Sequence, residues 1–250
     1  MRRYPSPHVS SFSFGPGPVS TALKALIAAN VAMFVVQFFL ADTTLLLGLQ
    51  PRVVVRNFWV WQVGTYMFLH STRSIFHILF NMLALWMFGT ELERIWGTRY
   101  FLKFYFVTGI GAGILTVLFS LLPFGFAEQL YYSGIVIGAS GAIYGLLLAY
   151  ALYFPDRPIY MYLLFPIPAK VFVAIMGAIA FFSSIGDAGG VANATHLGGL
   201  AVGYVFLKSA RVHPLSELKY RYLKWKINRV RKKFDVYSGG RADDWDRRVH

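Results

Sequence analysis

The sequence has no cysteine and little charge. Among its 250 residues, 14% are Asp, Glu, Lys or Arg, whereas 56% are hydrophobic and 18% are aromatic. The lack of thiols excludes disulfides and cysteine-ligated metal sites. A soluble domain has about 25% charged residues, so the shortage of charge excludes that class and predicts an integral, multi-pass membrane protein. We expect its location to be a bacterial plasma (inner) membrane.

Six apolar runs are candidates for membrane-spanning helices. A hydrocarbon core about 30 Å thick needs about 20 helical residues, a length that some runs reach comfortably and that the second and fifth do not. The pattern predicts an all-α membrane protein whose six transmembrane helices form a bundle. The runs cover approximately residues 22–40, 75–89, 107–127, 135–154, 171–185 and 191–207.

Lysine and arginine are distributed unevenly between the two sides of these runs. If the N-terminus is cytoplasmic, all but three of the 24 basic residues lie on the inner side, and only Arg52, Arg56 and Arg73 lie outside. Loops rich in Lys and Arg stay in the cytoplasm, so both termini are predicted to be cytoplasmic. We expect a flexible N-terminus (1–20), a six-helix domain (21–208) and a basic C-terminal tail (209–250).

The net charge of +13 comes mainly from the end of the chain, because 13 of the 24 basic residues lie in the last 43 positions. Since they follow a predicted membrane helix, we expect anionic lipid rather than nucleic acid as their partner. Leu215, Leu218, Tyr222 and Trp225 recur there at helical spacing. This spacing is typical of an amphipathic helix on the inner leaflet, and a solvated tail that only enforces topology is an equal alternative. From residue 237 onward the tail is predicted to be disordered.

Few polar side chains interrupt the apolar runs, and each is costly in lipid. His77 and Asn81 share a face of the second run, Ser140 lies in the fourth within the small residues 138–142, and His196 lies in the sixth. In the predicted orientation they all lie in the outer half of the membrane, at a similar depth. Independent accidents would not readily produce this common depth, so we expect the three helices to bring these groups together.

Two glycine pairs explain how the serine and the histidine can meet. Gly141 and Gly145 lie four residues apart in the fourth run, and Gly199 and Gly203 lie four apart in the sixth. Such surfaces let membrane helices approach closely. A short serine side chain can then reach an imidazole on the neighbouring helix.

This pairing permits nucleophilic catalysis. His196 would take the proton of Ser140, the alkoxide would attack a carbonyl, and the imidazolium would protonate the leaving amine. The acids predicted on the outer side all lie in connecting loops, so a Ser-His dyad is expected rather than a triad, with no metal or other cofactor. His77, the Asn81 amide and the backbone N–H of Ser140 are the available oxyanion donors, and the Tyr144 ring can pack against His196.

Each of these residues also has a simpler interpretation. A lone serine in a membrane helix usually packs against a neighbour or bonds to its own backbone. His77 and Asn81 can serve only as interhelical hydrogen-bonding groups, and His196 can be structural or part of a proton relay. The case for catalysis therefore depends on their conjunction.

Three motifs occur in order: HILFN at 77–81, GASG at 138–141 with Tyr144, and HLGGLAVG at 196–203. Together they resemble the rhomboid intramembrane serine proteases, over about residues 20–208. The resemblance implies a six-helix bundle that cleaves transmembrane segments of other proteins, with Ser140 as nucleophile and His196 as general base. The oxyanion side would be formed by His77 and Asn81, and the supporting residues would be Gly138, Gly141, Tyr144, Gly199 and Gly203.

Three positions depart from the family pattern. Gln62 stands where the family has an arginine, which puts arginine-dependent anchoring of the first loop in doubt. His70 precedes His77 by about two residues more than in the family form, and Thr195 replaces an alanine before the histidine of the third motif.

We therefore expect an intramembrane serine endopeptidase, a hydrolase that cleaves membrane proteins within the bilayer through Ser140 and His196. Its partners would be transmembrane protein substrates and membrane lipids. The alternatives are a non-catalytic rhomboid-like protein that binds client helices and a small transporter. Covalent labelling of a serine would distinguish the enzyme from both.

Overall fold

The computed structural model of the chain describes residues 17–40, 42–123, 125–161, 165–185 and 190–211. Most of the expected flexible N-terminus and almost all of the basic tail, with its expected amphipathic and disordered parts, lie outside these ranges. Two compact units divide the chain, Met1–Leu207 and Lys208–His250. Every described helix and strand begins in the first unit.

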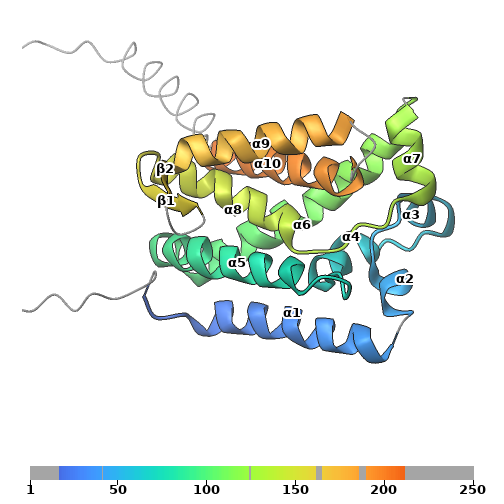
Figure 1. Cartoon of the computed structure of the whole chain (residues 1–250), viewed down its shortest axis with the longest axis horizontal. Helices are drawn as coiled ribbons and strands as arrows, with labels where there is room; N and C mark the ends of the chain where they lie inside the picture. The colour runs from blue at the N-terminus through green and yellow to red at the C-terminus, as the bar shows by residue number, and fades with distance from the viewer. Residues whose placement is uncertain (1–16, 41, 124, 162–164, 186–189, 212–250) are drawn as a thin grey trace, which may run out of the picture. The chain divides into compact units, whose positions relative to one another are not determined.

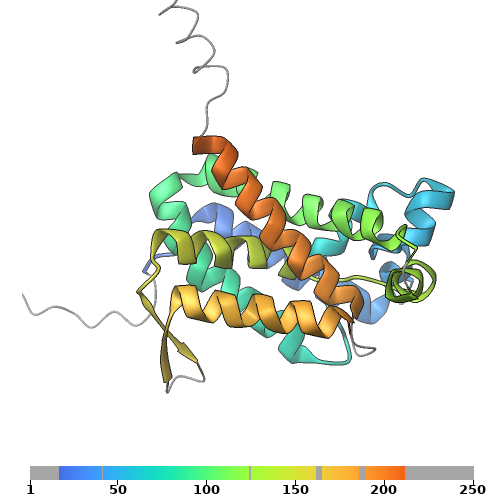
Figure 2. The same cartoon turned by 90° about the horizontal axis from the view of Figure 1, so that it is seen from above.

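Six long helices lie side by side in the described part of this unit, and consecutive ones run in opposite directions (Figures 1 and 2). By length and composition, α1, α5 and α6 can each cross a membrane, and α8 and α9 are shorter apolar helices. The chain is therefore mostly helical and multi-pass, as expected. The helices are α1 (Thr21–Phe39), α5 (Ile75–Trp96), α6 (Thr98–Ser120), α8 (Ser140–Tyr153), α9 (Ala169–Ile185) and α10 (Gly190–Arg211).

Two helices extend beyond the uncharged runs that predicted them. α5 continues through its acidic residues to Trp96, and α6 begins at Thr98. These acids remain in the helix because they are paired. The Glu93 carboxylate accepts hydrogen bonds from Ser20 Oγ at 2.5 Å and from Thr98 Oγ1 at 2.6 Å, which ties the beginning of α1 to the junction of α5 and α6.

The fourth apolar run is helical only from Ser140 onward, which differs from the expected position of Ser140 about five residues inside the run. Leu49 and Val136 form an antiparallel bridge, with both N–H to O distances at 2.9 Å, and the N–H of Gly138 donates to Tyr66 O at 2.9 Å. Gly138 has a φ of +122°, which a right-handed helix does not contain. α8 therefore has 14 residues, about 21 Å of helix.

Short elements that the apolar pattern did not predict lie at both ends of the long helices (Figure 1). One end carries the short helices before α5, together with α7. The helix α6 ends at Ser120, earlier than the predicted run 107–127, and α7 follows it. The other end carries an antiparallel hairpin, in which Pro158 pairs with Pro168. These elements are α2 (Thr43–Leu47), α3 (Pro51–Asn57), α4 (Gln62–Thr65), the 3-10 helix η1 (Tyr66–Phe68), α7 (Gly125–Ser133), β1 (Pro158–Met161) and β2 (Phe165–Pro168).

Gln62 holds the segment before α5 together. Its side chain is fully buried, and its Nε2 donates to the carbonyl oxygens of Leu45 at 3.2 Å and Leu46 at 3.3 Å. Its Oε1 accepts the N–H of Gln50 at 3.1 Å, and the neighbouring Trp61 Nε1 donates to Leu46 O at 3.0 Å. A neutral amide therefore anchors this loop, in the place where the family resemblance led us to expect an arginine.

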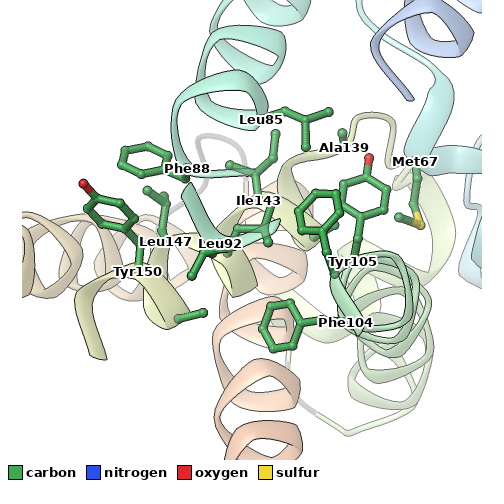
Figure 3. Close-up of a cluster of buried hydrophobic side chains, with 14 of the residues drawn as sticks. Met67, Leu85, Phe88, Leu92, Phe104, Tyr105, Ala139, Ile143, Leu147 and Tyr150 are labelled. Atoms are coloured by element: carbon green, nitrogen blue, oxygen red, sulfur yellow. The ribbon is translucent and has the colours of Figure 1, made fainter. Parts of the chain in front are cut away.

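The hydrophobic core lies where α5, α6 and α8 meet (Figure 3). Every residue of α8 from Gly141 to Leu147 is buried, as expected of a helix at the centre of a bundle. Tyr150 of α8 packs edge-on against Phe88 of α5, with ring centroids 4.9 Å apart. Ser140 is therefore carried at the beginning of an enclosed helix, whose position the core fixes. Figure 3 labels Met67, Leu85, Phe88, Leu92, Phe104, Tyr105, Ala139, Ile143, Leu147 and Tyr150.

Candidate active site

Ser140 and His196 are in contact although 56 residues separate them in the sequence. Ser140 Oγ lies 2.8 Å from His196 Nε2, with the serine at the first position of α8 and the histidine in the second turn of α10. Both residues are half-buried. The structure thus brings together the serine and the histidine that the sequence singled out.

Glycines on both helices allow this contact. A methyl group added at Gly199 would overlap the carbonyl oxygen of Gly141, and one added at Gly203 would lie 3.1 Å from Gly145 Cα. The backbones of α8 and α10 therefore touch, as small residues permit in membrane helices. At this separation the short side chain of Ser140 reaches the imidazole.

The ring of His196 is held by stacking. The Tyr144 ring lies parallel to it, with centroids 4.2 Å apart and an interplanar angle of 4°. His196 Nδ1 is buried and has no hydrogen-bond partner in the described ranges. Within them no carboxylate orients the imidazole from behind, so the Tyr144 ring and the contact with Ser140 hold it in place.

Replacing Tyr144 tests this role of stacking. We expect Tyr144→Phe to cleave a transmembrane reporter within about 3-fold of the wild-type rate, because the stacking energy resides in the ring and not in the hydroxyl. We expect Tyr144→Leu to lower the rate about 10- to 100-fold, the usual cost of a misplaced catalytic group. Purified variants in detergent give both rates, and equal rates for the two would contradict the assignment.

His77 of α5 lies beside the pair, and Asn81 lies one turn further along the same helix. A methyl group added at Gly138 would lie 2.9 Å from His77 Nε2 and 3.7 Å from Ser140 Oγ, so the lack of a side chain at Gly138 lets the His77 ring approach the backbone just before Ser140. Asn81 Nδ2 donates to His77 O at 2.6 Å, and Asn81 Oδ1 is buried with no partner among the described residues. One amide proton of Asn81 is therefore bound to the backbone of α5.

The backbone of Ser140 completes the set of groups predicted from the sequence. Ser140 is the first residue of α8, and N–H groups in the first turn of a helix have no partner in its own hydrogen-bond ladder. A nucleophile in contact with a base, next to N–H donors, has the parts needed for acyl transfer.

Several buried polar residues were not singled out in the sequence, among them Asn30, Gln37 and Thr116. Asn30 and Gln37 of α1 are both buried, and their spacing of seven residues on one helix face is a signal that was available. Thr116 of α6 bonds Thr195 of α10 at 2.8 Å, and Thr116 Oγ1 also donates to Ala112 O at 2.8 Å. The residue that replaces the family's alanine therefore links α10 to α6 next to the histidine.

The amino-acid sequence is similar to those of rhomboid proteins. A model of the rhomboid domain matches residues 57–210. The chain is 32% identical to the mitochondrial Rhomboid protein 1 of Saccharomyces cerevisiae over 139 residues, which cover 54% of this chain and 38% of that protein. It is 30% identical to Rhomboid protease GluP of Bacillus subtilis over 183 residues (70% of this chain, 32% of that protein), and 28% identical to Rhomboid protease AarA of Providencia stuartii over 215 residues (78% and 73%). The matched regions thus span less than two fifths of the yeast and Bacillus proteins.

Proposed function

The chain belongs to the rhomboid family, and on this basis we propose that it is an intramembrane serine endopeptidase with Ser140 as nucleophile and His196 as general base. The observation that carries the proposal is the 2.8 Å contact between Ser140 Oγ and His196 Nε2, which joins two helices. A hydroxyl and an imidazole are both costly in lipid. Hydrolysis at this point gives a reason for placing them together.

The reaction proceeds through an acyl-enzyme. His196 Nε2 takes the Ser140 proton while Oγ attacks the carbonyl carbon of the substrate, forming a tetrahedral intermediate. The imidazolium then protonates the leaving nitrogen as the peptide bond breaks. Water, deprotonated by His196, attacks the acyl-enzyme and releases the second product with Ser140 restored.

The negative oxygen of the tetrahedral intermediate needs donors. His77 Nε2 lies close to Gly138, two residues before Ser140, so we assign the oxyanion to the side of Ser140 that His77 faces. Its donors are His77 Nε2–H, the second amide proton of Asn81 and the Ser140 backbone N–H. Removing one such donor typically costs a factor of about 100 to 1,000 in turnover.

Transmembrane segments of other proteins are the proposed substrates, as the family relationship implies. The carbonyls of an intact helix are bonded within its own ladder, so the substrate must unwind locally before Ser140 can attack. Membrane lipids are the second partner, with anionic lipid at the basic tail.

We also propose six membrane spans with both termini in the cytoplasm, with the chain divided at residues 20 and 208 as the sequence suggests. The alternating direction of the long helices supports this (Figure 1). α8 is shorter than a bilayer, and the extended residues before it complete its crossing. Irregular backbone is tolerated at such depth where it is bonded inside the protein, as Val136 and Gly138 are. Because relatives include a mitochondrial protein, the bacterial plasma membrane stays a prediction.

Labelling by a fluorophosphonate probe tests the proposal. We expect the purified wild-type protein to be labelled and Ser140→Ala to be unlabelled. Ser120→Ala is the matched control, because Ser120 is a buried helix serine whose hydroxyl donates to Val117 O of its own helix at 2.7 Å. It should be labelled like the wild type. An unlabelled wild-type protein that binds client helices, or that moves a solute across vesicles, would identify one of the non-catalytic alternatives instead.

A further inference from the structure

The side chain of His77 is held by a turn that is itself tied to α1. The turn, residues 69–74, connects η1 to α5, and within it the N–H of Ser71 donates to His77 Nδ1 at 3.1 Å. The ring of His70 packs against the His77 ring at a steep angle, with centroids 5.1 Å apart and planes at 64°. The backbone N–H of His70 donates to Gln37 Oε1 at 2.9 Å. We propose that Gln37 is a positioning residue for His77, acting through this turn; the inference rests on the proposed oxyanion role of His77.

The Ser71 bond determines which ring nitrogen of His77 carries the proton. A backbone N–H can only donate, so His77 Nδ1 accepts and bears no hydrogen. The neutral ring then carries its hydrogen on Nε2, the nitrogen that faces Gly138, two residues before Ser140. The turn therefore gives His77 the tautomer that an oxyanion donor requires.

His70 supports the same arrangement as a buried, neutral neighbour. It is fully buried, and burial, together with the adjacent His77, lowers its pKa to about 4. At neutral pH it therefore places no positive charge beside His77. The His70 ring packs against the His77 ring, and the Ser71 N–H bonds to His77 Nδ1. Both groups belong to the turn, so movement of the turn would break both contacts together.

Gln37 is the group that holds the turn. Its side chain is buried, and both ends of the amide are used: Oε1 accepts from His70, and Nε2 donates to Thr44 Oγ1 at 3.0 Å. It thereby joins α1, α2 and the turn at one point. Gln37 lies before the region matched by the rhomboid domain model, which begins at residue 57. The domain that carries the candidate dyad is thus linked to a residue of α1 that the domain model does not include.

Three variants isolate this role. Gln37→Met keeps the length of the side chain and removes both hydrogen bonds. Gln37→Glu keeps an oxygen that can accept from the His70 N–H. Asn30→Leu is the matched control, because Asn30 is a fully buried amide two turns earlier on α1 whose Nδ2 donates to Leu26 O of the same helix at 2.8 Å, and not to the turn.

The cleavage kinetics should separate positioning from general loss of stability. We expect Gln37→Met to lower kcat about 10- to 100-fold with KM within about 2-fold of wild type, since the oxyanion donor acts in the transition state. The kcat of Gln37→Glu should lie between that of Gln37→Met and that of the wild type. Asn30→Leu should lower the melting temperature as much as Gln37→Met does, yet leave kcat within about 3-fold.

A spectroscopic measurement checks the tautomer without relying on activity. In 15N-histidine-labelled protein, with His77 assigned by comparison with His77→Ala, we expect an unprotonated Nδ1 and a protonated Nε2, and a mixture of both tautomers in Gln37→Met. Unchanged kcat and tautomer in Gln37→Met, or an equal loss of kcat in Asn30→Leu, would overturn the inference. A wild-type protein that cleaves nothing would instead overturn the proposed function, and the nitrogen spectra would still test the link from Gln37 to His77.

Discussion

His196→Ala is expected to lower cleavage of a transmembrane reporter by at least about 1,000-fold, because it removes the group that takes the proton from Ser140. An isolated serine hydroxyl is a poor nucleophile at neutral pH, and in the described part of the chain the imidazole nitrogen bonded to its oxygen is His196 Nε2, at 2.8 Å. The assay is the initial rate of reporter cleavage by purified protein in detergent or liposomes.

The double variant makes the prediction more specific. When residues act as one catalytic unit, the losses of rate caused by their substitutions do not add. We therefore expect the same low residual rate for Ser140→Ala, for His196→Ala and for the variant with both changes. The fold should persist in all three, since neither side chain belongs to the hydrophobic core, and melting temperatures check this. If His196→Ala still cleaves at a tenth of the wild-type rate or faster, another group is the base.

Much of the helical architecture could be predicted because it depends on one strong physical signal. Polar backbone must be bonded internally in lipid, so each of the six apolar runs contains most of one long helix, although α5 and α6 extend into charged residues. The beginning of α8 could not be predicted in this way. Residues 135–139 are as apolar as the helix that follows, and their extended form depends on bonds to Leu49 and Tyr66, partners more than 60 residues away.

The candidate site, too, could be predicted only in part. The glycines and the common depth of the polar groups predicted that Ser140 and His196 meet, and the structure brings them together, while their catalytic role stays a prediction. The place of Gln37 was missed. An amide in an apolar run indicates only that it needs a partner, and its partner here is the backbone N–H of His70, which carries no mark in the sequence. Gln62 was read as a lost arginine for the same reason, because its acceptors are the carbonyls of a loop that only the fold assembles.

Gly199 offers the sharpest test of how the two helices place the dyad. A methyl group at this position would overlap the carbonyl oxygen of Gly141, and no rotamer change can relieve an overlap with backbone. α8 and α10 must then separate, which moves His196, one turn away, from Ser140. We expect Gly199→Ala to lower the cleavage rate at least about 100-fold, the cost of a displacement of about 1 Å, and Gly199→Val to abolish cleavage and fluorophosphonate labelling.

Gly177→Ala is the control for this prediction. Gly177 is also a glycine of an apolar helix, α9, but a methyl group there would lie 3.4 Å from Leu200 Cδ1, an ordinary van der Waals contact with a flexible side chain. It should cleave and label like the wild type, and exchanging glycine for alanine removes backbone freedom from the unfolded chain, so its melting temperature should not fall. If Gly199→Ala behaved in the same way, the contact between α8 and α10 would not be what holds Ser140 and His196 in register, and the packing of α8 against α5 and α6 would have to do so alone.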